Sequence, residues 1–291
     1  MSVSAIIPAF NAGRTLRRAI ESVLRQTHPI EEIIVVDDGS SDATLKIAKS
    51  FAPGVRCISQ SNSGVAAARN AGAAAAAGRW LAFLDADDYW LPHKSAAQVA
   101  LAAAEPEVVL LYGSFQEFDN QGPTRSMPAH HPRLLWPELR FHNPLATSTV
   151  MLRRDVFVDV GGFDESLRHC EDWDLWVRCL ARGRFACTQE PVMMYENLNA
   201  GLSSDSEKNL EGLEKILDRT LLTGLSGWQR RVWRRKIRSW QMMSAGITAR
   251  NADPALEFHF LRRSVLEWPF PTWEPRRFRA FATTLRNRIV R

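Results

Sequence analysis

Three aspartates fall within four residues of one another, directly after an apolar run. Asp85, Asp87 and Asp88 follow Trp80–Leu84, a short run typical of a strand that is buried on both faces. On an extended backbone Asp85 and Asp87 share one side, because side chains alternate with a period of two. Carboxylates so close repel each other unless a cation neutralises them, and oxygen ligands without nearby cysteine or histidine favour Mg²⁺ or Mn²⁺ over zinc. The stretch is therefore a candidate site for one of these ions, with a solvated acidic turn as the alternative.

A second pair of acids opens a helical pattern in the later part of the chain. After Glu171 and Asp172, the residues Trp173–Ala181 carry apolar side chains at helical spacing. Asp172 therefore falls at or near a helix N-terminus, where the helix dipole favours the ionised carboxylate that a general base needs. A simple N-cap is the alternative role for this residue.

Strands and helices alternate along the first hundred residues. We predict strands at Val3–Ile7, Ile33–Val36, Val55–Ser59 and Trp80–Leu84, and helices at Leu16–Arg25, Ala43–Phe51, Val65–Ala77 and Pro92–Ala104. This alternation predicts an α/β layered fold with a parallel sheet, in which right-handed crossovers bring the carboxyl ends of the strands to one edge. Farther along, we predict a strand at Val108–Tyr112, a loop-rich region at Asn120–Pro144 and a strand at Thr147–Leu152.

The residues that follow three of these strands meet at the predicted edge. Pro8–Phe10 follow the first strand, Asp37 and Asp38 the second, and Asp85–Asp87 the fourth. Open parallel sheets bind ligands at this edge. A dinucleotide-binding Rossmann domain is excluded at the first turn, because PAFNAGRT lacks the G-x-G-x-x-G pattern and contains no P-loop lysine. A nucleotide bound here would need its pyrophosphate neutralised in another way, and a metal at the Asp85–Asp87 stretch would do so.

Composition limits the class of protein further. The chain has 291 residues, 45% of them hydrophobic and 24% charged, which is enough for a full core. No window is long and apolar enough to span a membrane and no signal-peptide pattern opens the chain, so we expect a soluble or peripheral protein. The four cysteines form no C-x-x-C pair and no zinc or disulfide pattern, which fits a reducing, cytoplasmic compartment.

Five stretches form a recognisable series. Four read VSAIIPAFNAGRTLRRAIESVLRQT, EIIVVDDGSSDAT, SGVAAARNAG and LAFLDADDYWLP and cover residues 3 to about 92, and the fifth, VGGFDESLRHCEDWDLWVRCL, runs from Val160 to Leu180. Together they resemble glycosyltransferase family 2, whose enzymes are inverting nucleotide-sugar glycosyltransferases with the GT-A fold. The resemblance implies a Rossmann-like nucleotide-binding sheet with helices on both faces. It also implies a GT-A domain at 1–204, with a nucleotide-binding half at 1–112 and an acceptor-side half at 113–204. Beyond Asp205 the resemblance fades, and there the helical spacing of apolar residues predicts a helical C-terminal extension.

The resemblance implies roles for individual residues on the donor side. Pro8 and Phe10 would line the base pocket and Asp38 would accept from a base N–H, while Asp37 either supports that turn or is a loop carboxylate. Asp87 would be the principal ligand of Mn²⁺ or Mg²⁺, and Asp85 would contact ribose or metal. The implied nucleotide-sugar site as a whole comprises Pro8, Ala9, Phe10, Asn11, Asp37, Asp38, Arg69, Asp85 and Ala86.

On the acceptor side, the resemblance marks Asp172 as the general base. The sugar and acceptor would be bordered by Gly162, Phe163, Asp164, Glu171 and Trp173. The chain departs from the family pattern in the next segment. Many relatives carry a Tyr-Arg-x-His run there, which helps to bind the diphosphate or metal, whereas this chain has Tyr195-Glu196-Asn197-Leu198. The Arg and His are replaced, so the diphosphate must be held differently or activity is reduced.

The C-terminal part carries the positive charge of the chain. Residues 205–291 contain 18 Lys and Arg against 9 Asp and Glu, a net charge of +9, which leaves −4 for residues 1–204 out of the total of +5. Within this basic helical region, Trp228–Met243 is rich in arginine with interleaved tryptophans. Such a helix is a candidate for peripheral contact with an anionic membrane surface, at the inner face of the membrane, and a packing helix with a solvated basic face is the alternative. No nucleic-acid-binding motif accompanies the charge.

The sequence as a whole predicts an inverting, metal-dependent glycosyltransferase. Its donor is a nucleotide sugar, UDP-linked in our prediction, and its acceptor is a hydroxyl of a glycan or of a lipid-linked oligosaccharide, as in polysaccharide biosynthesis. The alternative from another class is a nucleotide-sugar-binding protein without turnover, a non-catalytic partner in glycan assembly.

Overall fold

The computed structural model describes residues 1–119, 122–196, 206–249, 253–270 and 280–285. The chain forms two compact units, one made of residues 1–139 with 143–200 and the other of residues 140–142 with 201–291. The predicted boundary at residue 204 lies outside the described residues, so the division into the predicted domains stays a prediction.

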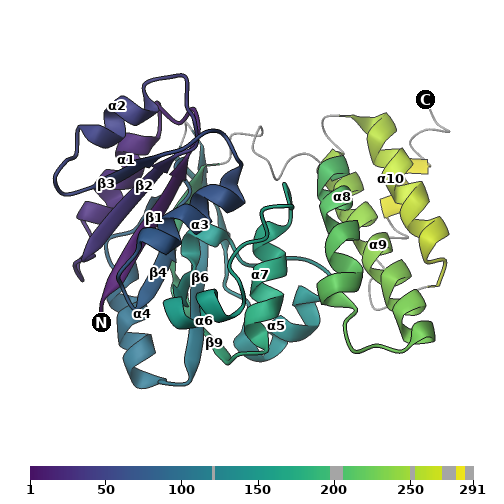
Figure 1. Ribbon diagram of the computed structural model, residues 1–291. Coiled ribbons are helices and arrows are strands. Elements are labelled where there is room, and N and C mark those ends of the chain that lie inside the picture. The colour runs from purple at the N-terminus through teal and green to yellow at the C-terminus, as the bar shows by residue number, and fades with distance from the viewer. Residues whose placement is uncertain (120–121, 197–205, 250–252, 271–279, 286–291) are drawn as a thin grey trace. The chain divides into compact units, whose positions relative to one another are not determined.

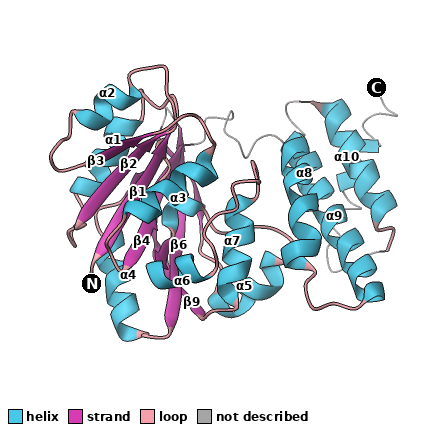
Figure 2. Ribbon diagram, viewed as in Figure 1, coloured by secondary structure: helices cyan, strands magenta, loops and turns pink. Residues whose placement is uncertain are grey.

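The first unit is built on one mixed sheet (Figures 1 and 2). Among the described residues nine strands belong to it, in the order β3-β2-β1-β4-β8-β6-β9-β5, with β7 paired to β6. The strands are β1 Val3–Ala9, β2 Glu32–Asp37, β3 Arg56–Ser59, β4 Trp80–Phe83, β5 Tyr89–Trp90, β6 Val108–Asp119, β7 Gly122–Met127, β8 Met151–Arg153 and β9 Arg184–Glu196. Strands β3, β2, β1 and β4 are mutually parallel, and β8 joins β4 in the antiparallel sense. The predicted α/β fold is confirmed.

Helices cover both faces of the parallel part of the sheet. The helices of this unit are α1 Leu16–Leu24, α2 Thr44–Lys49, α3 Val65–Ala75, α4 Lys94–Ala104, α5 Pro132–Leu139, α6 Arg154–Asp159 and α7 Glu171–Leu180. Strand β1 is buried throughout, and its residues Ala5 and Ile7 pack in one core cluster with Leu16 and Ile20 of α1. Ile6 points to the other face, where an ideal Cβ on Gly72 of α3 would lie 2.5 Å from its Cγ2 atom. The alanine- and glycine-rich face of α3 therefore allows the close approach of helix and sheet.

The region after β6 differs from the prediction. Strand β6 continues beyond the predicted end at Tyr112, forms a hairpin with β7, and pairs in parallel with β9, which was not predicted. Helix α5 and strand β7 occupy part of the predicted loop-rich region, and a 3₁₀ turn at Thr147–Thr149 replaces the start of the predicted strand Thr147–Leu152. The second half of β6 is largely half-buried and most of β7 is exposed, so neither shows the apolar pattern of a buried strand and long-range pairing decides their conformation.

The second unit is helical in its described part, as predicted. It contains α8 Ser206–Ile216, a π-helical turn at Leu217–Leu221, α9 Gly227–Ala249 and α10 Pro254–Glu267. Helices α9 and α10 pack together and are joined by hydrogen bonds between the buried residues Ser239 and Ser264. Arg238 pairs with Glu214 at 2.9 Å and so ties α9 to α8. In the described part of the chain, no helix has the length and apolar character needed to cross a membrane.

Candidate active site

The carboxyl ends of the parallel strands meet at one edge of the sheet. Ala9 of β1 is in register with Asp37 of β2, and the backbone N–H of Asp38 donates to the Ala9 carbonyl at 2.8 Å. On the other side of β1, Ile6 is in register with Phe83 of β4, and the Leu84 N–H donates to the Ile6 carbonyl at 3.0 Å. The predicted convergence of these three strand ends is therefore present in the fold.

Asp38 organises the loop that leads into α3. Its buried carboxylate accepts from Gln60 Nε2 at 2.8 Å, from the Ser63 N–H at 2.9 Å and from the Gly64 N–H at 2.8 Å. Asp37 is also buried and accepts a long hydrogen bond of 3.4 Å from Ser59 Oγ. Asp38 thus supports the turn predicted to hold the nucleobase and fixes the start of α3, whereas the side chain of Asp37 bonds to the neighbouring strand β3.

The first strand end presents an exposed aromatic ring. Phe10 is 52% exposed, whereas Pro8 and Ala9 are buried in β1. Asn11 adopts a left-handed backbone (φ 48°), and its Oδ1 accepts from the Ser41 N–H at 2.9 Å. The ring of Phe10 is therefore available to a planar ligand, while Asn11 holds the neighbouring loop.

Arg69 joins the donor side of the predicted site to the acceptor side. The side chain is only 4% exposed, and its guanidinium donates to Asp85 Oδ1 at 2.7 Å and to Glu171 Oε1 at 2.8 Å. Burial opposes the charged form, but the two carboxylates outweigh it and raise the pKa of Arg69 above its ordinary value. The resemblance placed Arg69 in the nucleotide-sugar site, and the structure pairs it with Asp85 and with Glu171 on α7. Glu171, predicted to border the sugar, is thus a partner of Arg69.

The three clustered aspartates form a tight turn rather than the extended backbone predicted for Asp85 and Asp87. The Asp88 N–H donates to the Asp85 carbonyl at 3.1 Å, and Ala86 and Asp87 lie in the turn between β4 and β5. We call residues 85–88 the acid turn. Ser148 holds the acid turn by two hydrogen bonds. Its Oγ accepts from the Asp85 N–H at 3.0 Å and donates to Asp88 Oδ2 at 2.5 Å.

The acid turn suits a hard divalent cation. Asp87 faces solvent but is crowded by protein atoms, and this desolvation together with the charge of Asp85 raises its pKa to about 6. Burial and the two neighbouring carboxylates likewise raise the pKa of Asp88. A cation would relieve this repulsion, and Asp85 retains its Oδ2 atom for a ligand while Oδ1 binds Arg69. Among the described residues, no group of three or more Asp, Glu, His or Cys side chains is arranged to hold a metal by itself.

Asp172 lies in the first turn of α7, as predicted, and its carboxylate is firmly oriented. Oδ2 accepts from Asn143 Nδ2 at 2.8 Å and from Thr147 Oγ1 at 3.1 Å, and Oδ1 accepts from the Trp173 N–H at 2.6 Å. Burial and the adjacent Glu171 raise the pKa of Asp172 to about 7, against the opposing charge of Arg69 and these hydrogen bonds. A carboxyl group with such a pKa can take up a proton near neutral pH.

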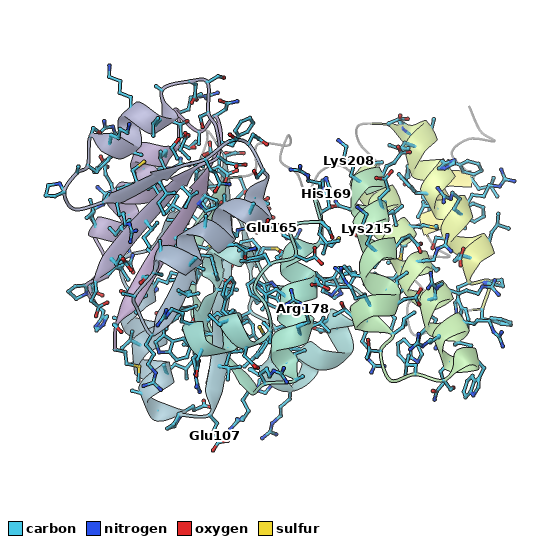
Figure 3. All side chains as sticks on the ribbon, in the orientation of Figure 1. Glu107, Glu165, His169, Arg178, Lys208 and Lys215 are labelled. Atoms are coloured by element: carbon cyan, nitrogen blue, oxygen red, sulfur yellow. The ribbon has the colours of Figure 1, made fainter. Side chains whose placement is uncertain are left out.

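The predicted border of the sugar and acceptor is mostly a packing element. Phe163 and Trp173 are buried, and the Trp173 Nε1–H donates to the Leu139 carbonyl at 2.6 Å. Both residues are thus packed in the core, and their predicted place at the border of the sugar stays a prediction. Gly162 is buried with φ +66°, and its carbonyl accepts from Arg178 of α7, labelled in Figure 3, at 2.8 Å. Asp164 is partly exposed and its Oδ1 accepts from the Ser166 N–H at 2.8 Å, as in a surface turn.

Several residues that contact the site were not predicted to do so. Thr147 and Asn143 orient Asp172, and Ser148 holds the acid turn. Arg18 of α1 donates to the Asp87 carbonyl at 2.7 Å and forms an ion pair with Glu196 of β9. Glu196, which stands where many relatives carry arginine, is thereby tied to the acid turn. Asn197 and Leu198 lie outside the described residues.

The sheet order and the strand ends define an α/β protein with the GT-A type of fold. A family model described as "Glycosyl transferase family 2" matches residues 4–161, and one described as "Glycosyltransferase like family 2" matches residues 133–221. The chain belongs to glycosyltransferase family 2.

Curated relatives and solved structures agree with this assignment. An uncharacterised glycosyltransferase of Rickettsia prowazekii is 30% identical over 190 residues, which cover 60% of this chain and 58% of the relative. The chain thus spans little more than half the length of that relative. The Escherichia coli protein named UDP-Glc:alpha-D-GlcNAc-diphosphoundecaprenol beta-1,3-glucosyltransferase WfgD is 31% identical over 61% of this chain and 69% of its own length.

Two solved structures share the fold at low sequence identity. Staphylococcus aureus TarS 1-349 in complex with UDP-GlcNAc has a TM-score of 0.66 and 18% identity, covering 92% of this chain and 81% of that chain. The mannosyltransferase PcManGT from Pyrobaculum calidifontis, in complex with GDP-Man and Mn²⁺, has a TM-score of 0.62 and 18% identity, covering 98% of this chain and 86% of that chain.

Proposed function

We propose that the chain is an inverting, metal-dependent glycosyltransferase that transfers a sugar from a UDP-linked donor to a hydroxyl of a glycan or lipid-linked acceptor. The observation that carries the proposal is the buried bridge from Asp85 through Arg69 to Glu171, next to which Asp172 presents an oriented carboxylate. The name of WfgD and the UDP-GlcNAc bound in the TarS complex support a UDP-linked donor, and the name of WfgD supports a lipid-linked acceptor.

The described residues divide the chemistry between two sides. Asp38 and the exposed ring of Phe10 bind and orient the nucleobase, and Arg69 holds the two sides together. Asp85 and Asp87 would hold Mn²⁺ or Mg²⁺, which when bound supplies a Lewis acid for the leaving diphosphate. Asp172 takes the proton of the acceptor hydroxyl. The hydroxyl oxygen attacks the anomeric carbon from the face opposite the diphosphate, and the bond between that carbon and the diphosphate breaks. The configuration at the anomeric carbon is thereby inverted.

Turnover of a donor sugar tests the proposal directly. Purified protein with Mn²⁺ is expected to release UDP slowly from a UDP-sugar and faster with an acceptor. Thermal unfolding with a panel of nucleotide sugars identifies the donor, since a ligand that binds the native state raises the unfolding temperature. The replacement of the family's Arg by Glu196 favours the alternative of a binding protein without turnover, and UDP binding with no hydrolysis of any donor would support that alternative.

We expect kcat/KM to depend on pH through Asp172. The base must be ionised, and its pKa is raised to about 7. The protonated fraction therefore grows below this value, so kcat/KM should fall about tenfold per unit of pH below about 6.5 and be level above about 8. Initial rates at fixed Mn²⁺ and subsaturating donor would measure this. A rate that stays constant between pH 6 and 8 would exclude Asp172 as the titrating base.

We propose peripheral membrane contact, at the cytoplasmic inner face, through the N-terminal part of α9. Trp233 and Trp240 pack against Phe141 within the second unit, whereas Trp228 is 63% exposed on an arginine-rich helix. We expect Trp228→Ser to lower binding to anionic phosphatidylglycerol vesicles several-fold in a sedimentation assay. Val158→Ser, a change at an equally exposed apolar residue of α6, is the matched control. Equal binding of wild type and Trp228→Ser would contradict the proposal.

A further inference from the structure

Lys94 is a buried lysine that the proposed chemistry does not use. It opens helix α4 and is only 1% exposed. Its Nζ donates to Gln98 Oε1 at 2.7 Å and lies 4.2 Å from the centre of the Trp90 ring. Burial lowers its pKa to about 7, and no carboxylate in the described part of the chain forms an ion pair with it. Burying an amine costs free energy unless the amine is hydrogen-bonded, so the contacts of Lys94 determine whether it can be kept in the interior.

Both partners of Lys94 hold the carbonyl groups of one turn. Gln98 Nε2 donates to the Thr149 carbonyl at 2.8 Å, and Trp90 Nε1 donates to the Ser148 carbonyl at 2.8 Å. These carbonyls belong to the 3₁₀ turn Thr147–Thr149, whose residues are buried. The turn is therefore anchored from one side by the two side chains that Lys94 contacts.

The other side of the same turn contacts both halves of the proposed active site. Thr147 Oγ1 donates to Asp172 Oδ2 at 3.1 Å, which orients the proposed base. Ser148 Oγ accepts from the Asp85 N–H at 3.0 Å and donates to Asp88 Oδ2 at 2.5 Å, which fixes the acid turn. Successive residues of one short turn thus link the base, the acid turn and the buried Gln98.

We propose that Lys94 is a positioning residue that, through Gln98 and Trp90, sets the place of the Thr147–Thr149 turn and so aligns Asp172 with the acid turn. This inference rests on the proposed glycosyl transfer. Lys94 itself is not a catalytic residue, because its amine contacts only Gln98 and Trp90 in the hydrogen bonds and ring contacts above.

The chemistry of the lysine explains why this residue type suits the position. In its protonated form the amine of Lys94 has only donors, so Nζ faces the carbonyl oxygen Oε1 of Gln98. The amide nitrogen Nε2 is then directed at the Thr149 carbonyl, and the alternative flipped amide is disfavoured. The charged amine also attracts the face of the Trp90 indole, whose N–H holds the Ser148 carbonyl. An apolar side chain of similar length leaves both orientations of Gln98 open.

The test compares Lys94→Met and Gln98→Glu with wild type. Lys94→Met keeps the length of the side chain but removes the donor, and Gln98→Glu keeps a partner for Nζ but removes the donor to Thr149. We expect both variants to lower kcat about 10- to 100-fold, as small misplacements of reacting groups do, with the UDP dissociation constant within about twofold of wild type. Amide hydrogens of Thr149 and Val150, which bond within the turn, should exchange faster than in wild type.

A pH profile separates positioning from mere stability. Thr147 donates to Asp172 and thereby lowers its pKa, so loosening the turn should move the midpoint of kcat/KM to higher pH. The charged and titratable groups that face Asp172 are Glu171, Arg69 and Cys170, and all are kept in both variants. Thr147→Val retains Lys94 and should produce a shift in the same direction. Coupling between Lys94→Met and Thr147→Val in a double-mutant cycle would show that they act through the same turn.

Ser95→Ala is the matched control. Ser95 is buried on the same helix, and its Oγ donates to the His28 carbonyl at 2.7 Å, away from the turn. This variant should lose stability but keep kcat and the pH midpoint. The inference is overturned if folded Lys94→Met and Gln98→Glu both match wild type in kcat, pH midpoint and turn exchange. If wild-type protein shows no turnover, the proposed function is contradicted. The hydrogen exchange of the Thr149 and Val150 amides, compared between the variants and wild type, would then test the inference by itself.

Discussion

The change Asp172→Asn is expected to lower glycosyl transfer by about 10²- to 10⁴-fold, the usual contribution of a general base. Asparagine has nearly the same shape but cannot take up a proton from the acceptor hydroxyl. Its Oδ1 can still accept from the Trp173 N–H, and the Thr147 hydroxyl can turn to accept from the new NH₂ group. The variant should therefore fold, and UDP should still raise its unfolding temperature in the presence of Mn²⁺. The rate of UDP release with donor and acceptor measures the effect.

A matched control carries the same change of charge elsewhere in the first unit. Asp159 pairs with Arg182 at 2.6 Å, and the proposed mechanism gives it no role. Asp159→Asn therefore removes a carboxylate of this unit without changing a proposed catalytic or binding group. This variant should transfer sugar at nearly the wild-type rate. Transfer by Asp172→Asn at the wild-type rate would mean that the base is another group, and the site would have to be assigned again.

The nucleotide-binding half could be predicted because its signals are local. Strands β1, β2 and β4 are short apolar runs. Acidic residues end β2 and follow β4, Phe10 and Asn11 follow β1, and right-handed crossovers bring the three strand ends to one edge. The resemblance also placed Arg69, a single cation among alanines, in the nucleotide-sugar site. Its partner Glu171 could not be read from the sequence, since it lies 102 residues away on a helix whose position depends on packing.

The residues that hold the active-site side chains in place were harder to predict from the sequence, for physical reasons. Lysine is rarely buried, so no sequence pattern indicates that Lys94 lies in the interior. The run Thr147–Thr149 suits a strand by propensity, yet the carbonyls of Ser148 and Thr149 bond to side chains of distant elements and the segment adopts a 3₁₀ turn. Strand β9 likewise contains a proline and several polar residues, and its pairing with β6 is long-range.

The second large effect is expected at the acid turn. Asp87→Asn removes one of the two carboxylates that would hold the divalent cation, and we expect turnover at saturating donor and moderate Mn²⁺ to fall by more than about 10²-fold. The Mn²⁺ concentration required for half-maximal activity should rise, and UDP should no longer raise the unfolding temperature more with Mn²⁺ than with EDTA. Because Asp87 faces solvent, the change should cost little stability.

Asp88→Asn provides the comparison within the same turn. Asp88 is buried, and the pKa of its carboxyl is raised by burial and by Asp85 and Asp87, so the neutral amide resembles the protonated form that the fold favours. Asp88→Asn should therefore keep the Mn²⁺ dependence of wild type, whereas Asp87→Asn should lose it. An equal loss of Mn²⁺ dependence in both variants would contradict the proposal that Asp87 is a metal ligand. The exposed Asp87 would then behave like the buried Asp88, as expected if the acid turn has only a structural role. Loss in Asp87→Asn alone would place the cation on the exposed carboxylate, next to the Asp85 that Arg69 already holds.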